Sequence, residues 1–236
     1  MREQRKPWKN YRRQQAANSL RKYKEDKKRM EITRKRTEET NWGQVKELVA
    51  AGSLKVGDEI SDNLLTGQKM VYVVADITEE EVKFVSKDLL AERVVWNENG
   101  RSTGGFKESD LCRYLNEEVW AILPEELKAV ISERECLQIV EGKEERFMLK
   151  LWLPSEFEVF GDSWASEVEE GQQFELFKDP RNRVKFDQDG ERAYWWLLSV
   201  CAGYSTYACC VNDDGIADYD SCSVALRVPV CFSIKK

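Results

Sequence analysis

The longest unbroken apolar run of the chain is Ala193-Tyr-Trp-Trp-Leu-Leu198. A run of this length is typical of a buried β-strand and is far shorter than the ~20 apolar residues of a membrane-spanning helix. The runs Arg183-Val-Lys-Phe186, Tyr207-Ala-Cys-Cys-Val211 and Leu226-Arg-Val-Pro-Val-Cys-Phe-Ser-Ile234 are also rich in β-forming residues, and Gly, Asp and Asn separate them. We therefore expect short strands joined by turns in this part of the chain, and no membrane span.

The preceding region contains both helix and strand signals. Trp42–Ala51 is helix-forming and is followed by Gly52, a common helix stop. Ser109 is a candidate N-cap, and Ser155-Glu-Phe-Glu158 is a capping box that opens a helix. In chain order we predict a helix at 42–51, strands at 69–76 and 81–86, helices at 109–122 and 125–131, a strand at 150–153 and a short helix from 155. This irregular order of helices and strands favours the α+β class.

The absence of histidine excludes several classes of site. The chain has 236 residues, of which 42% are hydrophobic and 34% are charged, and it has no His. This composition is that of a globular protein. Ser/His and Cys/His nucleophile pairs, HExxH zinc sites and mixed Cys/His zinc fingers all need an imidazole group, so they are excluded. Any acid–base chemistry would use Asp, Glu, Lys, Tyr or Cys.

Charge is distributed unevenly along the chain. Residues 1–36 contain 15 Lys and Arg and four acidic residues, a net charge of +11, whereas the whole chain carries −6. Residues 37–236 therefore carry −17, and we divide the chain into a basic arm (1–36) and an acidic body (37–236). The arm lacks Gly between Trp8 and Arg36, which favours a helix. Three interpretations of the arm are open: a solvated tail, a segment that docks on nucleic acid or another polyanion, and a segment that docks on an acidic protein.

The seven cysteines are predicted to be free thiols. Their number is odd, none are spaced as CxxC, and Cys209 and Cys210 are adjacent, which strains an ordinary disulfide. The first residues, Met-Arg-Glu-Gln-Arg-Lys, do not lead into the apolar segment of a secretory signal peptide. We expect reduced cysteines that serve mostly as small apolar core residues.

Residues 200–225 differ in composition from the rest of the chain. They read Val-Cys-Ala-Gly-Tyr-Ser-Thr-Tyr-Ala-Cys-Cys-Val-Asn-Asp-Asp-Gly-Ile-Ala-Asp-Tyr-Asp-Ser-Cys-Ser-Val-Ala and contain no Lys, Glu, Gln, Met, Trp or Arg. The first five of these types supply 70 of the 236 residues, so about 8 are expected in 26 residues. Burial alone does not explain the composition, because five Asn and Asp residues lie in the same stretch. Tyr, Ser, Asn and Asp together are typical of antibody binding sites, although ordinary sheet packing of the tyrosines is an alternative.

Motifs on both sides of this segment resemble one family. They are Val56-Gly-Asp58, Gly104-Gly-Phe106 with Ser109 and Tyr114-Leu-Asn116, Leu123-Pro124, Leu151-Trp-Leu-Pro-Ser-Glu-Phe-Glu-Val-Phe-Gly161, Tyr194-Trp-Trp-Leu-Leu-Ser199, Asp214-Gly215 and Arg227-Val-Pro-Val-Cys-Phe232. Over residues 42–234 the chain resembles the variable proteins of diversity-generating retroelements, which are bacterial and phage proteins of C-type-lectin-like fold. It departs from their usual Trp-Leu-Arg-Ser-Pro at Trp196–Val200 and from their Gly-Val-Arg-Pro at Ala225–Pro229, which leaves the borders of the variable segment open.

The resemblance implies both a fold and a function. The fold would be α+β and C-type-lectin-like, with short twisted antiparallel strands, a few helices and much loop, preceded by the basic helical arm. In this family, randomised asparagine codons do not yield Lys, Glu, Gln, Met or Trp, and the composition of residues 200–225 fits that history. The implied function is non-enzymatic binding of a protein or cell-surface ligand, by a cytoplasmic or virion-associated protein without a signal peptide. The alternative is a nucleic-acid-associated protein that acts through residues 1–36.

All the ligand-binding positions that we predict lie in this diversified segment, and we expect them on one exposed face. They are Tyr204, Ser205, Tyr207, Cys210, Asn212, Asp213, Ile216, Asp218, Tyr219, Asp220, Cys222 and Val224. Because neighbouring side chains of a regular strand point to opposite faces, so many exposed positions predict mostly irregular loop around short strands. The residues predicted to form or border the supporting core are Trp152, Phe160, Trp195, Trp196, Leu197, Val228 and Phe232.

Metal and redox chemistry are not favoured. The aspartates between 213 and 220 offer oxygen ligands for Ca²⁺, and Asp187-Gln-Asp-Gly190 resembles the first half of a calcium loop, but neither completes a motif. Formylglycine-generating oxidases share the broad fold and use a cysteine pair with copper. An activated thiolate needs a nearby cation, however, and residues 200–226 contain none. We therefore predict no catalytic residue, no metal ion and no cofactor.

Overall fold

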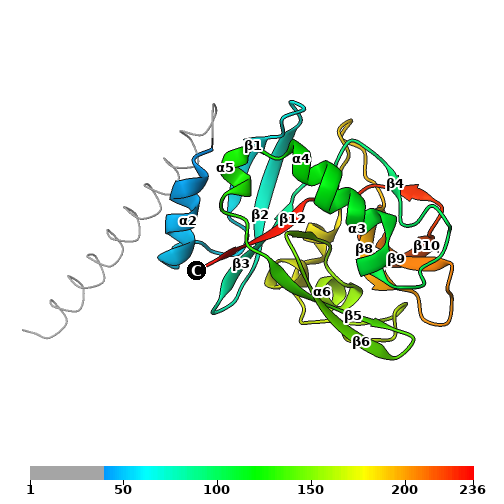
Figure 1. The fold of residues 1–236 in the computed structure, drawn as a ribbon. Helices are drawn as coiled ribbons and strands as arrows, with labels where there is room; N and C mark the ends of the chain where they lie inside the picture. Colours follow the sequence, from blue (N-terminus) through cyan, green and yellow to red (C-terminus); the bar gives the residue numbers. More distant parts are fainter. Residues whose placement is uncertain (1–39) are drawn as a thin grey trace, which may run out of the picture. The chain divides into compact units, whose positions relative to one another are not determined.

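The fold is built around a five-stranded antiparallel sheet with the strand order β1-β2-β3-β12-β7 (Figure 1). The computed structural model describes residues 40–236, and Asn41–Lys236 form one compact unit. The strands of this main sheet are β1 Glu59–Asn63, β2 Lys69–Ile77, β3 Glu81–Ser86, β7 Leu151–Trp152 and β12 Cys231–Lys235. Strand β12 pairs with β3 on one side and with β7 on the other. The predicted basic arm, residues 1–36, and its helix lie outside the described residues.

Smaller antiparallel sheets complete the β-structure. A three-stranded sheet has the order β10-β9-β8, with β8 Trp195–Val200, β9 Tyr207–Val211 and β10 Ala217–Ser221. Strand β4 Val94–Val95 pairs with β11 Ala225–Leu226, and β5 Arg134–Val140 forms a hairpin with β6 Lys143–Leu149. These sheets and a few short helices confirm the predicted α+β class.

The helices begin where the capping residues predict. Helix α2, Trp42–Ala50, buries Trp42, Val45 and Val49, which lie on one face at helical spacing. The Ser109 side chain accepts a hydrogen bond from the Cys112 N–H at the start of α3, and Ser155 with Glu158 forms the complete capping box of α6. The helical segments are α2, α3 Asp110–Tyr114, a π-helical turn at Leu115–Val119, α4 Trp120–Ile122, α5 Glu125–Lys128, α6 Glu156–Phe160 and 3₁₀ turns at Phe106–Glu108, Glu175–Lys178 and Pro180–Arg183.

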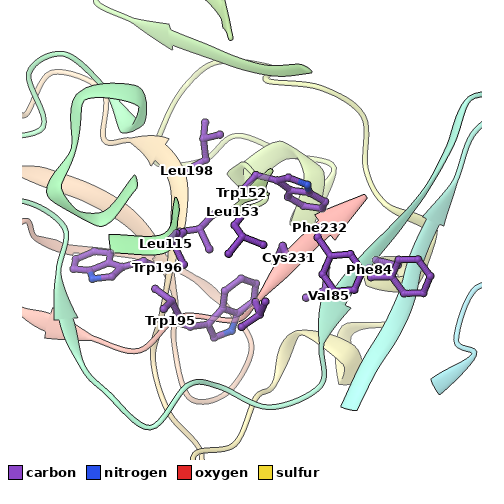
Figure 2. Close-up of a cluster of buried hydrophobic side chains, with 14 of the residues drawn as sticks. Phe84, Val85, Leu115, Trp152, Leu153, Trp195, Trp196, Leu198, Cys231 and Phe232 are labelled. Carbon is purple, nitrogen blue, oxygen red and sulfur yellow. The ribbon is translucent and has the colours of Figure 1, made fainter. Parts of the chain in front are cut away.

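Tryptophans fill the core, as predicted. Trp152 and Phe232, from the main sheet, and Trp195, from the three-stranded sheet, lie around Cys231 in one cluster (Figure 2). Trp196 is also fully buried, and its indole N–H donates to the Val94 carbonyl over 2.9 Å. Each of the seven residues predicted to form or border the core is buried or, for Phe160, packs half-buried against it. The scaffold on which the segment 200–225 rests is therefore the one that the sequence predicts.

Three sequence expectations about strands and helices are wrong. Residues 183–186 are not a strand, because Arg183 ends a 3₁₀ turn and Phe186 forms an isolated bridge with Arg192 and no ladder. The Lys185 side chain between them donates to the backbone carbonyls of Ser86 and Lys87. The strand predicted at 226–234 is interrupted at Pro229, which lacks an N–H, so that β11 ends at Leu226 and β12 begins at Cys231. The helix predicted at 125–131 ends at Lys128.

Among the described residues, none of the helices combines the length and the apolar composition that crossing a bilayer requires.

Candidate recognition surface

Strands β9 and β10 form a hairpin from the middle of the unusual segment. Their register pairs Cys209 with Tyr219 and Ser221 with Tyr207, so the side chains of Tyr207 and Tyr219 are diagonal neighbours on one face of the hairpin. Strand β9 also pairs with β8, which leaves β10 as the edge strand. The edge position explains why Tyr219 is exposed whereas the middle strand is buried from Ala208 to Val211.

Four aromatic side chains follow one another on this face, and we call them the aromatic row: Tyr204, Tyr207, Tyr219 and Trp164. The ring centroids of Tyr204 and Tyr207 are 6.0 Å apart, and those of Tyr207 and Tyr219 are 5.6 Å apart, both edge-to-face. The Trp164 ring stacks on Tyr219 at 5.7 Å with an interplanar angle of 27°. Tyr204 is 62% exposed, Trp164 60% and Tyr219 41%. Large rings that contact one another and still face solvent are a ready contact area for a ligand.

A buried glutamate fixes the loop that carries Trp164. The carboxylate of Glu156, in α6, accepts hydrogen bonds from the backbone N–H groups of Ala165 at 2.9 Å and Ser166 at 2.7 Å. The Ala202 N–H donates to the Ala165 carbonyl over 2.9 Å, which joins this loop to the loop between β8 and β9. The ends of the aromatic row are therefore positioned by one carboxylate and one backbone hydrogen bond.

The turn between β9 and β10 depends on Asn212 and Gly215. The Asn212 side-chain oxygen accepts hydrogen bonds from the N–H groups of Asp214 at 3.0 Å and Ile216 at 2.9 Å. The Asn212 amide therefore stabilises the turn. Gly215 has φ +78°, and a Cβ there would lie 2.9 Å from the Val184 Cγ2 atom. The turn leaves Asp213 and Ile216 exposed.

The structure distributes the predicted binding residues unevenly. The exposed ones are Tyr204, Ser205, Asp213, Ile216, Tyr219 and Val224, and the half-buried ones are Tyr207, Asn212, Asp218 and Asp220. The predictions for Cys210 and Cys222 as surface positions are wrong, because both side chains are fully buried. Cys210 lies on the middle strand opposite Trp196 and Asp218, where a small side chain fills the space between neighbouring strands.

The expected loops around short strands are present in this segment: residues 201–206, 212–216 and 222–224 lie outside strands, and β9 and β10 pair as a hairpin. The expectation of one shared face, in contrast, needs correction. Because side chains alternate along β10, Asp218 and Asp220 point to the face opposite Tyr219, so the predicted positions do not share one face. On that opposite face, partial burial and the nearby carboxylates of Asp213 and Asp218 raise the pKa of Tyr194.

A pocket of about 550 Å³ adjoins the aromatic row. It is formed by four segments, at residues 102–103, 139–142, 166–168 and 200–205, and Tyr204 belongs to both the row and the pocket wall. The Ser102 N–H donates to the Ser205 carbonyl over 2.9 Å, which holds two of these segments together. The pocket and the aromatic row together make up what we call the recognition surface.

The thiols of the described region are poorly suited to nucleophilic chemistry. All seven cysteines are free and buried. Burial raises the pKa of Cys222 to about 11, and burial with the nearby Glu156 carboxylate raises the pKa values of Cys201 and Cys209. A thiol in such surroundings stays protonated at neutral pH. Within residues 40–236, no three His, Cys, Asp or Glu side chains are grouped so that they could hold a metal ion.

A second buried carboxyl group, that of Glu170, lies next to the pocket wall. Its oxygens accept hydrogen bonds from the Ile139 N–H at 2.6 Å and from the Ser199 hydroxyl. Burial raises the pKa of Glu170 from 4.5 to about 7, and these hydrogen bonds offset only part of the effect. The folded protein therefore holds a proton on Glu170 in a pH range where the unfolded chain has released it.

This proton makes stability depend on pH. Because the folded state binds more protons than the unfolded state between pH 4.5 and about pH 7, the free energy of unfolding should fall as the pH rises through this range. Relative to Glu170→Gln, which keeps a neutral side chain of the same shape, the wild type should lose about 3 kcal/mol between these limits. Urea unfolding of both proteins at several pH values measures the difference. Parallel curves for the two proteins would contradict the assignment.

Sequence reasoning did not find several parts of this surface. Trp164 follows the end of α6 within the turn-forming run Gly161-Asp-Ser-Trp-Ala-Ser166. Because turns lie at the surface, a tryptophan in this run could have been predicted to be exposed. Glu141, Glu167 and Ser102 carried no such signal, because only the tertiary fold brings their loops together.

Comparison with known families places most of this region in one of them. Residues 80–236 match the family described as a domain of unknown function, DUF6273. No curated protein and no solved structure shows a significant match. The matched residues run from the start of β3 to beyond β12 and include the aromatic row, the pocket and the buried glutamates. Because the match spans well over half of the chain, the protein belongs to the DUF6273 family.

Proposed function

We propose that this protein is a non-enzymatic binding protein whose recognition surface contacts a protein or cell-surface ligand. The aromatic row carries the proposal: three exposed rings and one half-buried ring contact one another beside a pocket, on a scaffold of fully buried tryptophans. Tyr and Trp offer large contact areas and lose few rotamers on binding, which makes them the usual energetic anchors of interfaces.

The recognition surface has a proposed genetic origin. We propose that the chain is a variable protein of a diversity-generating retroelement and that its body is a C-type-lectin-like domain. The composition of residues 200–225 supports this, since Lys, Glu, Gln, Met and Trp are all absent there. The mostly antiparallel α+β architecture and the protonated buried thiols are compatible with a binding domain of this kind.

The DNA beside the gene tests the origin. We expect a reverse-transcriptase gene and a near-copy of the codons for about residues 194–232 that differs from them only at adenines. A genome that contains this gene without either neighbour would overturn the retroelement part of the proposal and leave the binding surface to be tested separately.

Peptide selection tests the surface. Random peptides displayed on phage are enriched on the full chain, and their affinities are then measured for Trp164→Ala/Tyr219→Ala. We expect the double variant to bind the enriched peptides about tenfold more weakly or worse, because aromatic anchors dominate interfaces. The matched control is Leu65→Ala, which removes an apolar side chain that is 66% exposed but lies outside the surface. If both variants keep the wild-type affinities, the aromatic row is not the binding surface.

A further inference from the structure

The charged side chains that line the pocket are all acidic. Among the residues that line it, Glu141 and Glu167 are the only charged ones. Both are exposed, and within residues 40–236 neither carboxylate accepts a hydrogen bond or pairs with a cation. A phosphate or carboxylate ligand would find no cation in this lining, whereas a positively charged group would find two unpaired carboxylates.

The backbone at both glutamates is unusual. Glu141 has φ +52° and Glu167 has φ +56°, and within the described residues these are the only non-glycine residues with positive φ. Glu141 precedes Gly142 in the two-residue turn of the β5–β6 hairpin, where Asn or Asp is the common residue. Glu167 ends a single helical turn, in which its N–H donates to the Ser163 carbonyl over 2.9 Å. Both turns would accept glycine without strain, yet each places a carboxylate at the pocket.

The rest of the wall combines apolar and hydroxyl-bearing residues. Ile139, Val140, Val168 and Val200 line the pocket beside four Ser and Thr residues, and Tyr204 adds an aromatic ring. The side chains of lysine and arginine combine an apolar stem with a cationic end that donates hydrogen bonds, so they match a wall that offers aliphatic groups, hydroxyls, carboxylates and a ring. The volume of about 550 Å³ lies within the range of pockets that hold small ligands.

We infer that this pocket takes the side chain of a lysine or arginine from a basic segment of the protein ligand. The inference rests on the proposed function, since Tyr204 joins the pocket to the aromatic row and the rest of the segment would lie along that row. Residues 200–226 contain no Lys or Arg, so the neighbouring surface would not repel such a segment.

Matched peptides test the inference directly. The probes are the peptides Gly-Ser-Lys-Ser-Gly and Gly-Ser-norleucine-Ser-Gly, both acetylated at the N-terminus and amidated at the C-terminus, which differ only in the side-chain amine of lysine. Binding to the isotope-labelled full chain is followed by the shifts of its backbone amide signals. We expect the lysine peptide to shift signals of residues 139–142, 166–168 and 200–205 and to bind about tenfold more tightly than the norleucine peptide. Equal binding of the two peptides, or shifts elsewhere, would overturn the inference.

Variants assign the effect to the two carboxylates. Glu141→Gln/Glu167→Gln keeps both side-chain lengths and should remove the preference for lysine, whereas Glu98→Gln, a control at an exposed carboxylate outside the pocket lining, should keep it. Butylammonium is a third probe: if it binds as tightly as the lysine peptide, the site takes a free amine and not a protein segment. If the lysine preference fails while Trp164→Ala/Tyr219→Ala still loses the selected peptides, only the ligand class is wrong and the proposed function stands.

Discussion

Replacing Trp196 with alanine should lower the free energy of unfolding by about 3–5 kcal/mol. The side chain is fully buried, so its loss removes apolar contacts and leaves a cavity that the surrounding sheets can close only in part. It also leaves the Val94 carbonyl without the indole N–H that it accepts. The total free energy of unfolding of a typical domain is about 5–15 kcal/mol, so the variant should be close to unfolded at moderate temperature. Urea denaturation followed by circular dichroism measures the change.

The matched comparison is Tyr204→Ala, at the exposed end of the aromatic row. Tyr204 is 62% exposed, so we expect its removal to change stability by only about 0.5 kcal/mol. This difference between the two variants is what separates a scaffold from a display surface. If Tyr204→Ala unfolds the protein as readily as Trp196→Ala does, the segment 200–225 is part of the core and the binding proposal loses its physical basis.

Replacing Arg134 with leucine should lower the free energy of unfolding by a similar amount, but for an electrostatic reason. This buried guanidinium pairs with the Glu158 carboxylate and lies over the Trp152 ring, with 4.2 Å from its central carbon to the ring centroid. Arg134→Leu keeps an apolar side chain at this position but leaves Glu158 buried without its cation. An unpaired buried charge of this kind costs about 3–5 kcal/mol.

A second substitution separates the charge from the loss of packing. In Arg134→Leu/Glu158→Gln, the amide oxygen can still accept the Ser155 N–H of the capping box, whereas the negative charge is gone. We expect the double variant to recover much of the stability that Arg134→Leu loses. A double variant that is as unstable as the sum of both single variants would show that the buried charge is not the cause.

The sequence predicts those elements that depend on residues close to one another in the chain. Ser109 and Ser155 fix helix starts through hydrogen bonds to residues three positions away, and the structure contains both caps. The run that contains Trp195 and Trp196 was recognisable as buried strand because it is apolar throughout. In contrast, β6 reads Lys-Glu-Glu-Arg-Phe-Met-Leu and looks polar, since only its pairing with β5 along a full register makes it a strand.

Composition distinguished the segment 200–225 from the rest of the chain, but it did not predict the geometry of the segment. Composition cannot tell which strand of a sheet lies in the middle, and Cys210 was misplaced for this reason. The partners of the segment come from distant loops: Trp164 stacks on Tyr219 across 55 positions of sequence, and Glu141 reaches the pocket from another hairpin. Such neighbours depend on the tertiary fold and leave no pattern along the chain.

The place of β12 has a consequence for synthesis on the ribosome. This strand joins β3 to β7 in the main sheet, yet it follows the segment 200–225 in the chain. The sheet therefore cannot close until the whole segment has been translated in frame, because residues 231–235 are read after it. A chain that is truncated or frameshifted within residues 200–225 would lack β12 and expose the edge of β3, and we expect it to be open to proteolysis. The topology thus makes closure of the main sheet depend on a full-length chain.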